Sequence, residues 1–330
     1  MKILVTGSTG FLGSHLCELL KQSGHEVYAQ ARNKKKFQMF KVQGHFIQGD
    51  LETEQANHWV SKLPEDLDVV VHAAGIVHSF KEGSFYKINT EGTKQLIEDL
   101  KIKYPKLHFI FLSSLSAAGP SLKNPVDEKT TEEPVSHYGR SKLLAEKTIL
   151  NEAPKEWSLS IVRPPMIIGP RDEGVLDIFK MVKGGIALKA GMTIKTKMYS
   201  FICIFDVTKF ILKLIQKEAQ HRETYFISHS KLISFEDLVH GIKEARKQKL
   251  LWTLPIPLLL LKSLARLLKV GHQLFSLNFR LTPDKVSELI PPQWTCSPQK
   301  AFREFEFDVD WDLKKTIEVT LDDYKQRNWL

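Results

Sequence analysis

The chain has few of the features that mark secreted, metal-binding or disulfide-stabilised proteins. It contains only three cysteines in 330 residues, Cys17, Cys203 and Cys296, and they lie far apart. An odd count without a close pair argues against a disulfide framework and against a zinc site. We therefore expect a reduced, cytoplasmic protein without a bound metal.

Long hydrophobic runs are also missing. The first apolar run, Ile3–Val5, is too short for the core of a signal peptide. The most apolar later stretch, Leu250–Val270, contains two prolines and three basic residues, which make it a poor membrane span. We interpret it as a wall of the substrate pocket, with an amphipathic surface helix as the alternative.

The chain also has no excess of acidic residues, because its formal net charge is +9. Such a charge favours phosphorylated cofactors, nucleic acids or anionic surfaces as partners. The basic residues are spread along the chain, however, and their longest run is Lys34-Lys35-Lys36. We therefore expect a solvated basic surface and no nucleic-acid partner.

The first half of the chain alternates short apolar segments with segments of helical periodicity. Phe11–Gln22 and Phe85–Tyr104 show helical spacing. Short, largely apolar strands separated by helices predict a parallel sheet that is covered on both faces, the doubly wound α/β fold. The expected strands are Lys2–Thr6, Glu26–Ala31, His45–Gln48, Asp68–His72 and His108–Leu112.

The second half is less regular. Leu159–Arg163 is typical of a sixth strand, and it ends at Pro164-Pro165. Helical patterns follow at Phe205–Lys217, Ser234–Lys247 and Leu313–Gln326. We divide the chain into a nucleotide-binding domain, 1–165, and a smaller lobe, 166–330, that mainly binds substrate. The chain is expected to return to the sheet near 199–228.

A glycine-rich turn follows the first strand and opens the first helix. Its sequence is Thr6-Gly7-Ser8-Thr9-Gly10-Phe11-Leu12-Gly13. Glycine permits the tight turn, Gly10 allows the backbone to approach a pyrophosphate, and Gly13 allows close helix packing. The free amides at the helix start can then hold the anion. Strand before and helix after are the context that a dinucleotide site requires.

The end of the second strand bears on the choice of cofactor. NAD sites usually place an acidic residue there for the ribose hydroxyls. This chain has no acid over Tyr28–Lys36, whereas Arg32 is positioned to pair with a 2′-phosphate. The pattern favours NADP over NAD, and NAD stays open as the alternative.

Two further motifs carry catalytic chemistry. Tyr138 and Lys142 are four residues apart and so share one face of a helix. An ammonium beside a phenol favours the phenolate, which would lower the tyrosine pKa toward neutrality. Ser114 ends the fifth strand, at the sheet edge where doubly wound folds bind ligands. Its hydroxyl is a candidate hydrogen-bond donor to the reacting oxygen.

These motifs, in this order, resemble the extended short-chain dehydrogenase/reductase family, also called the NAD-dependent epimerase/dehydratase family. The resemblance extends over about the first 210 residues. It rests on Thr6–Gly13, Gly49-Asp50-Leu51, His72-Ala73-Ala74-Gly75, Asn89–Thr93, Ser113-Ser114, Tyr138–Lys142, Arg163-Pro164-Pro165 through Gly169-Pro170, and Phe205-Asp206-Val207.

The resemblance implies a Rossmann domain and hydride transfer at a secondary alcohol or ketone. Tyr138 would be the acid/base, Ser114 would orient the substrate oxygen, and Lys142 would hold the nicotinamide ribose. A homodimer through helices of the nucleotide-binding domain is compatible with it. His72, His78 and His137 would be structural or would support the catalytic residues without acting in catalysis, and Asn89 would support the site through backbone contacts or cap a helix. The expected cofactor contacts are Gly7, Thr9, Gly10, Phe11, Leu12, Gly13, Arg32, Asp50, Leu51, Ala73, Ala74, Gly75, Tyr138, Lys142 and Pro165.

Departures from the family pattern narrow the chemistry. Leu115-Ser116 stand where dehydratases of the family carry an acidic pair, and Met166 stands where many sugar-nucleotide epimerases carry asparagine. We therefore expect a reductase or dehydrogenase for a moderately apolar small molecule. A nucleotide-sugar epimerase or reductase is the alternative, with Arg163, Arg171 and Lys180 as candidate diphosphate partners. A cofactor-binding protein without turnover is the third hypothesis.

Overall fold

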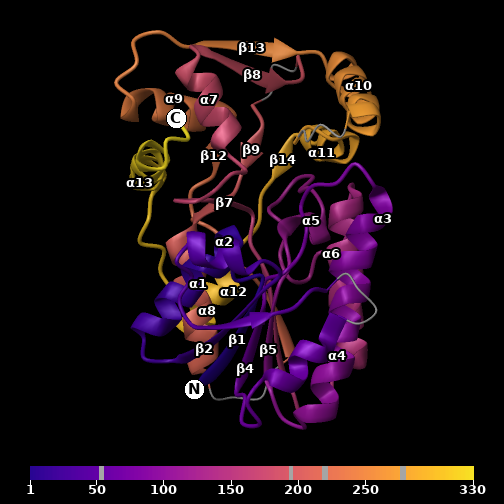
Figure 1. Ribbon diagram of the computed structural model, residues 1–330. Helices are drawn as coiled ribbons and strands as arrows, with labels where there is room; N and C mark the ends of the chain where they lie inside the picture. The colour runs from indigo at the N-terminus through magenta and orange to yellow at the C-terminus, as the bar shows by residue number, and fades with distance from the viewer. Residues whose placement is uncertain (52–55, 193–195, 218–221, 276–279) are drawn as a thin grey trace.

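The computed structural model describes residues 1–51, 56–192, 196–217, 222–275 and 280–330. Its centre is a parallel sheet of seven strands in the order β11-β6-β5-β4-β1-β2-β3 (Figure 1). The strands are β1 (Lys2–Thr6), β2 (Glu26–Ala31), β3 (His45–Gln48), β4 (Val69–His72), β5 (His108–Leu112), β6 (Ser158–Arg163) and β11 (Arg222–Phe226).

The predicted doubly wound fold is confirmed. Apolar side chains alternate between the two faces of the sheet, so that Ile3 and Val5 of β1 belong to one buried cluster and Leu4 to the other. Hydrophobic burial on both faces explains why the strands are almost continuously apolar. The order reverses between β1 and β4, and such a switch point is where doubly wound sheets bind ligands.

Helices cover both faces of the sheet (Figure 1). On one face lie α1 (Phe11–Gln22), α2 (Lys34–Met39), α8 (Ile204–Gln216) and α12 (Gln299–Phe305). On the other lie the 3-10 segment η1 (Ala56–Lys62), α4 (Gly92–Lys103) and α6 (His137–Glu152). Segments from the second half, α8, β11 and α12, thus complete the nucleotide-binding domain.

One predicted helix, Phe85–Tyr104, differs in detail. It consists of α3 (Glu82–Phe85), a π-helical segment η2 (Tyr86–Glu91) and α4. The wider turn contains Asn89, whose side-chain amide hydrogen-bonds the backbone of Ile76 and the hydroxyl of Ser141. π-Segments inside helices often occur at functional sites, and this one packs against α6.

The remaining elements form the smaller lobe at the carboxyl edge of the sheet. Its core packs α7 (Leu176–Lys183), α9 (Phe235–Ala245) and α13 (Leu313–Gln326) together. The short strands pair as β7 (Met166–Ile168) with β10 (Phe201–Cys203), as β12 (Ile233–Ser234), β9 (Met198–Tyr199) and β14 (Gln293–Trp294), and as β8 (Ile186–Ala190) with β13 (Trp252–Ile256). The short helix α5 (Leu115–Ala118), together with α10 (Leu258–Phe275) and α11 (Pro283–Leu289), completes the described elements.

Within the described residues, no helix combines the length and apolarity needed to cross a bilayer. The apolar stretch 250–270 contains β13 and most of α10. Many of its large side chains face solvent, among them Leu259, Leu260 and Leu267. The alternative of an amphipathic surface helix describes these side chains, whereas Leu250 and Trp252 of the same stretch line a shallow hollow; the interpretation as a wall of the substrate pocket stays a prediction.

Candidate active site

The glycine turn has the backbone geometry that its sequence requires. Gly7 has a φ of +66°, and a Cβ there would lie 2.8 Å from the Cα of Ala74. A Cβ on Gly13 would lie 2.4 Å from the carbonyl oxygen of Gly7, so only glycine permits this close packing. Gly10 is exposed, with no atom but the Gly7 oxygen near its missing side chain. The turn therefore presents open backbone at the start of α1, the feature that holds a pyrophosphate.

The turn is continuous with the segment that follows β4. Ala74 contacts Gly7, and the next residue, Gly75, would have a Cβ 3.8 Å from the Lys142 ammonium nitrogen. A Cβ on Gly75 would also meet the Asn89 amide oxygen at 2.9 Å. The expected cofactor residues Ala73, Ala74 and Gly75 thus form one strip of backbone between the glycine turn and the lysine. This strip has no bulky side chain of its own, as an extended dinucleotide would require.

The ends of β2 and β3 flank the other side of the turn. Gln30 is buried, accepts a hydrogen bond from the Gly7 amide at 3.0 Å and donates one to the Gly49 carbonyl at 2.7 Å. Arg32 is exposed just past the end of β2. Asp50 is half-buried after β3, whereas Leu51 is buried and packs under Gly92. Gln30 thus connects the ends of β1, β2 and β3 through its side-chain hydrogen bonds. Arg32 lies beside this connection with its side chain exposed.

Ser114 and Tyr138 meet at the carboxyl edge of β5. The Ser114 hydroxyl lies near enough to the Tyr138 phenol to act to lower the tyrosine pKa, and Tyr138 lies on the first turn of α6. Ser114 also accepts a hydrogen bond from the Ser116 amide at 3.1 Å and so caps α5. The serine therefore combines a structural cap with a position beside the phenol.

Lys142 lies one helical turn after Tyr138 and is buried. Its ammonium nitrogen lies 4.2 Å from the centre of the Phe111 ring. Burial lowers the pKa of Lys142 to about 7, and the nearby Glu146 carboxylate opposes the shift. The lysine is held in an apolar setting that is rare for this residue type.

The expected lowering of the Tyr138 pKa is wrong for this structure. Burial raises that pKa, the nearby Ser114 hydroxyl opposes the increase, and the Glu288 carboxylate adds to it. Desolvation of the half-buried phenol is the largest effect, and Lys142, whose own pKa is lowered by burial, is not among the groups that oppose it. The tyrosine is therefore a neutral phenol, the form that donates a proton.

A buried ionic network packs against helix α6 through Glu146. Glu146 accepts hydrogen bonds from Ser113 and from Arg163, whose guanidinium nitrogens lie 3.0 and 2.5 Å from its two oxygens. Arg163 also contacts Glu132 at 3.0 Å. Arg171 similarly binds Glu18 at 2.8 Å. Arg163 is thus committed to buried carboxylates, and its suggested role as a diphosphate partner is not supported. Arg171 is partly exposed and pairs with the partly exposed Glu18, and Lys180 is exposed on α7.

The three histidines named from the sequence occupy different settings. His72 lies between the hydroxyls of Thr6 and Thr93, at 2.7 and 2.9 Å, and burial lowers its pKa to about 3. His137 contacts the Tyr86 hydroxyl at 3.0 Å and Glu82 at 3.2 Å. His78 differs, because its buried Nδ1 has no partner within the described residues. Burial lowers the pKa of His78 to about 4, so it is neutral.

Sequence reasoning missed α11, which brings two carboxylates to the first turn of α6. Asp284 accepts hydrogen bonds from the backbone amides of His137 and Tyr138, at 2.6 and 3.2 Å. Glu288 accepts one from Ser136 at 2.9 Å and contacts Lys285 at 2.7 Å. Burial tends to raise the Glu288 pKa, but Lys285, Ser136 and Ser116 together hold it below its ordinary value. The one local signal was Thr282-Pro283-Asp284, a helix start of ordinary type.

Pro165 is half-buried between β6 and β7. The preceding Pro164 accepts a hydrogen bond from the Leu115 amide at 2.8 Å, which fixes the end of β6 against α5. Thr9, Phe11 and Leu12 are half-buried at the glycine turn. The expected cofactor residues thus lie along the carboxyl edge of the sheet, with Ser114, Tyr138 and Lys142 at its far end from Arg32.

A profile of the NAD dependent epimerase/dehydratase family matches residues 3–228. The chain belongs to this family. The resemblance inferred from the motifs is thereby confirmed, and members of the family are enzymes.

Curated relatives of this family member differ in the reaction that their names describe. This chain is 28% identical over 268 residues to the N-acetyl-alpha-D-glucosaminyl-diphospho-ditrans,octacis-undecaprenol 4-epimerase of Escherichia coli O157:H7. The match covers 78% of this chain and 76% of that protein. The chain is 30% identical over 180 residues to the ceramide reductase of Caulobacter vibrioides, covering 54% of this chain and 50% of that protein.

Among solved structures, a Bacillus cereus UDP-glucuronic acid 4-epimerase in complex with UDP-glucuronic acid and NAD superposes with a TM-score of 0.77. The match covers 99% of this chain and 100% of that one, at 23% sequence identity. A likeness at this identity establishes the common fold of the two chains.

Proposed function

We propose that this protein is an NAD(P)-dependent oxidoreductase that acts on a secondary alcohol or its ketone, with Tyr138 as the acid/base. The observation that carries the proposal is the closeness of the half-buried Tyr138 phenol to the Ser114 hydroxyl, which acts to lower the tyrosine pKa, one helical turn from Lys142. Two hydroxyls this close to one another can both reach a single substrate oxygen. The backbone strip from Gly7 to Gly75 supports a dinucleotide beside them.

In the reductive direction the Tyr138 phenol donates its proton to the carbonyl oxygen, while Ser114 donates a hydrogen bond to the same oxygen. The nicotinamide, when bound, supplies the hydride to the carbonyl carbon. The raised Tyr138 pKa favours the protonated form that this step needs. Lys142 would hold the nicotinamide ribose. Asn89 bonds the backbone of Ile76 and so supports the course of the strip.

The substrate is proposed to be moderately apolar. Met166, in place of a polar side chain, packs against the hydrophobic core of the smaller lobe. The two relatives above are named for lipid-containing compounds, an undecaprenol diphosphate sugar and a ceramide. These names support an apolar or lipid-linked substrate rather than a small polar one.

A nucleotide-sugar epimerase is the second candidate, because UDP-glucose 4-epimerases recur among the relatives. The E. coli relative is named as an epimerase for a lipid-linked sugar, so an epimerase reaction and a partly apolar substrate are compatible. Both candidates begin with oxidation or reduction at one carbon, so Tyr138 has the same role in each. They differ in net products, since an epimerase regenerates its cofactor within each turnover.

The test is turnover of wild-type protein and Tyr138→Phe on ketones, on UDP-sugars and on undecaprenyl-diphosphate sugars. We expect Tyr138→Phe to keep cofactor affinity and to lose about 10²–10⁴-fold in turnover, since only the hydroxyl is removed. Net change in nicotinamide absorbance selects the reductase, and isomerised sugar without such change selects the epimerase. Near-wild-type turnover in Tyr138→Phe would contradict the assignment.

A further inference from the structure

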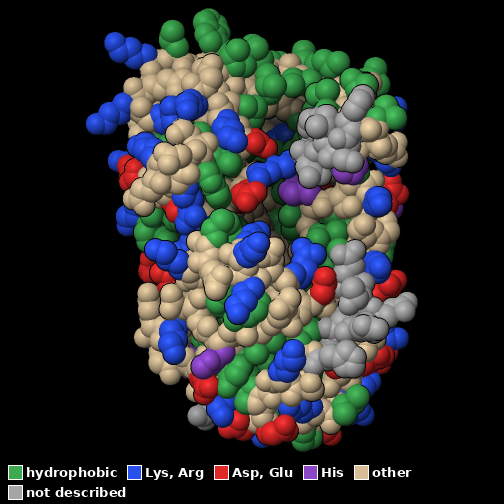
Figure 2. Space-filling model, in the orientation of Figure 1, with side chains coloured by type: hydrophobic (Ala, Val, Ile, Leu, Met, Phe, Trp, Pro, Cys, Tyr) green, Lys and Arg blue, Asp and Glu red, His purple; other side chains and the backbone are tan. Residues whose placement is uncertain are grey.

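The end of the smaller lobe farthest from the N-terminus has an exposed apolar face built from β8, β13 and α10 (Figures 1 and 2). Figure 2 shows hydrophobic side chains gathered along this margin of the molecule. We define the apolar face by these residues, with the exposed fraction of each: Ile186 (46%), Leu188 (42%), Trp252 (66%), Leu254 (46%), Leu259 (75%), Leu260 (60%), Leu264 (42%), Leu267 (66%), Val270 (48%) and Leu274 (69%).

The two strands contribute an ordered part of this face. Trp252 lies opposite Ile186 in the ladder, and Leu254 lies opposite Leu188. Because alternate residues of a strand share a face, these four side chains project from the same side of the β8–β13 pair. Soluble strand pairs normally place polar side chains on their solvent side. The pair therefore presents a flat apolar surface to the outside.

The helix α10 adds an apolar stripe on its solvent side. Leu261 and Ala265 are buried and face the protein, whereas Leu260, Leu264 and Leu267 recur at helical spacing on an exposed face. Lys262 and Arg266 are exposed between these two faces. A helix that is apolar on both its inner and outer sides is expected to be covered on both. The basic stripe of Lys262 and Arg266 beside the outer side favours a partner with negative charge.

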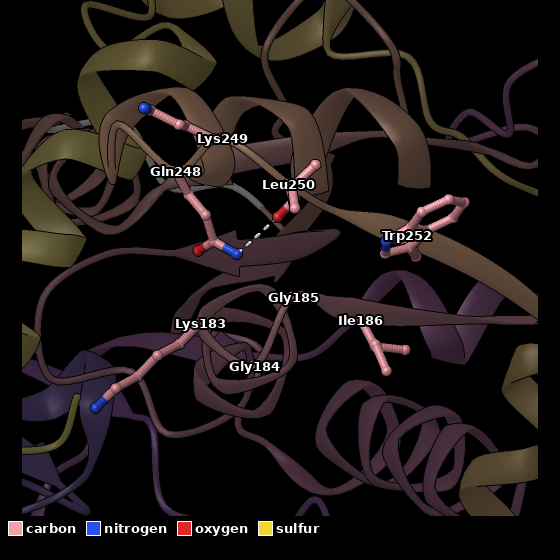
Figure 3. A pocket seen from close by; sticks show the side chains of 8 residues that line it. All are labelled: Lys183, Gly184, Gly185, Ile186, Gln248, Lys249, Leu250 and Trp252. Carbon is pink, nitrogen blue, oxygen red and sulfur yellow. Dashed lines mark hydrogen bonds between the residues drawn. The ribbon is translucent and has the colours of Figure 1, made fainter.

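The sequence around the apolar face is rich in basic residues, of which Lys189, Lys269 and Arg280 pair with Glu236, Glu82 and Glu173 from other segments. Residues 245–283 contain no Asp or Glu but seven basic residues, Arg246, Lys247, Lys249, Lys262, Arg266, Lys269 and Arg280. Residues 178–192 contain no acid but three lysines, Lys180, Lys183 and Lys189. Lys183 and Lys249 also line a shallow hollow with Ile186, Leu250 and Trp252 (Figure 3). Among the described residues, no acidic side chain pairs with Lys183, Lys249, Lys262 or Arg266.

We propose that this apolar face binds the surface of an anionic lipid bilayer, with the leucines and Trp252 inserted between lipids and the lysines and arginines at the headgroups. Amphipathic helices with Leu or Trp on one side and Lys or Arg on the other lie in membrane interfaces in this way. Each basic side chain near an anionic surface adds to the attraction. Tryptophan is favoured at the boundary between headgroups and acyl chains.

A second copy of the chain fits this face less well. A symmetric dimer would place the same patch on both partners, and the basic residues around it would then oppose one another. The phosphate groups of anionic lipids instead complement them. The face also lies close to the candidate active site, because α10 packs against α11, the helix that carries Asp284 and Glu288.

The experiment is flotation of the full chain with vesicles of phosphatidylcholine alone or mixed with phosphatidylglycerol. The wild type is expected to bind the anionic vesicles, and added salt weakens that binding because it screens the charges. Leu260→Ser/Leu267→Ser should bind about tenfold or more weakly, because two apolar anchors are lost. The matched control is Ile102→Ser/Leu122→Ser, which changes two more exposed apolar residues outside this face (84% and 79% exposed) and should bind as the wild type does.

Two further measurements test the contribution of the basic side chains and the insertion of Trp252 into the bilayer. Lys262→Gln/Arg266→Gln should weaken binding to anionic vesicles only, and its control is Lys101→Gln/Lys106→Gln. Brominated lipids should quench tryptophan fluorescence in the wild type but less in Trp252→Phe. Failure of the wild type to bind, or equal loss in the apolar control, overturns the proposal. A dimer that Leu260→Ser/Leu267→Ser dissociates, without vesicle binding by the wild type, assigns the face to a second copy instead. None of these readouts depends on turnover.

Discussion

The side chain of Asp284 accepts a hydrogen bond from the backbone amide of Tyr138, with 3.2 Å between Oδ2 and the nitrogen. Its other oxygen accepts from the amide of His137 at 2.6 Å. A carboxylate at a helix start is stabilised by the free amides and by the helix dipole. The smaller lobe is thereby fastened to the turn of α6 that carries the proposed acid/base.

We expect Asp284→Asn to lower the free energy of unfolding by about 1 kcal/mol, since the charge and one acceptor are lost. It should also lower kcat/KM, because α11 and the first turn of α6 are no longer held together. Urea denaturation and steady-state kinetics measure the two effects. The matched control is Asp312→Asn at the start of α13, where Asp312 accepts from the Lys315 amide at 2.8 Å. Equal kinetic effects in both variants would show that Asp284 has no special relation to the site.

Removing the charge of Glu288 should change the pH dependence of turnover. The Glu288 carboxylate raises the Tyr138 pKa, so Glu288→Gln is expected to lower it. A proton donor is lost as pH rises through its pKa, and the alkaline limb of kcat/KM should therefore move to lower pH. Glu82→Gln is the control. Glu82 contacts His137, the neighbour of Tyr138 on α6, but is not among the groups that shift the Tyr138 pKa. An unchanged alkaline limb in Glu288→Gln would exclude this electrostatic coupling.

The nucleotide-binding half of the fold was readable from the sequence because its determinants are local. Buried strands such as β1 and β5 are short apolar runs, and the Gly7 turn must contain glycine where its backbone meets Ala74. The pairing of Ser114 with Tyr138 followed from motif order and from the position of strand ends in a parallel sheet.

The parts that were not predicted depend on contacts between distant segments. Asp284 and Glu288 reach α6 across about 150 residues of chain, and nothing in their local sequence indicates that destination. The periodicity of residues 258–275 predicts a helix but does not tell which of its two apolar sides the protein covers. The Tyr138 pKa was misjudged because the spacing to Lys142 shows proximity and not the degree of burial.

Stability should depend on pH through Lys142. Burial lowers its pKa to about 7 in the folded chain, from an ordinary value of 10.5. Between these two pH values the unfolded chain binds more protons at this lysine than the folded chain does, so the free energy of unfolding rises with pH. The destabilisation is full below about pH 7 and is gone above the unfolded pKa.

We therefore expect the difference in unfolding free energy between wild type and Lys142→Met to change across that range. One proton contributes at most about 1.4 kcal/mol per pH unit. Lys147→Met, an exposed position on the same helix, should parallel the wild type. Parallel curves for wild type and Lys142→Met would show that Lys142 keeps its ordinary pKa.

Arg32 should select between the two nicotinamide dinucleotides. It is exposed just past the end of β2, and β2 is fixed to the glycine turn because Gln30 accepts a hydrogen bond from the Gly7 amide at 3.0 Å. No acidic residue lies between Tyr28 and Lys36 to accept bonds from ribose hydroxyls. We expect wild type to bind NADP(H) more tightly than NAD(H), as measured by calorimetry. Arg32→Ala should lose about 1.5–3 kcal/mol of affinity for NADP(H), the value of a hydrogen bond to a charged group. The internal control is the affinity of Arg32→Ala for NAD(H), because NAD(H) has no 2′-phosphate and should bind the variant as it binds the wild type. Tighter binding of NAD(H) by wild type, or equal losses for both cofactors in Arg32→Ala, would show that another part of the site sets the preference.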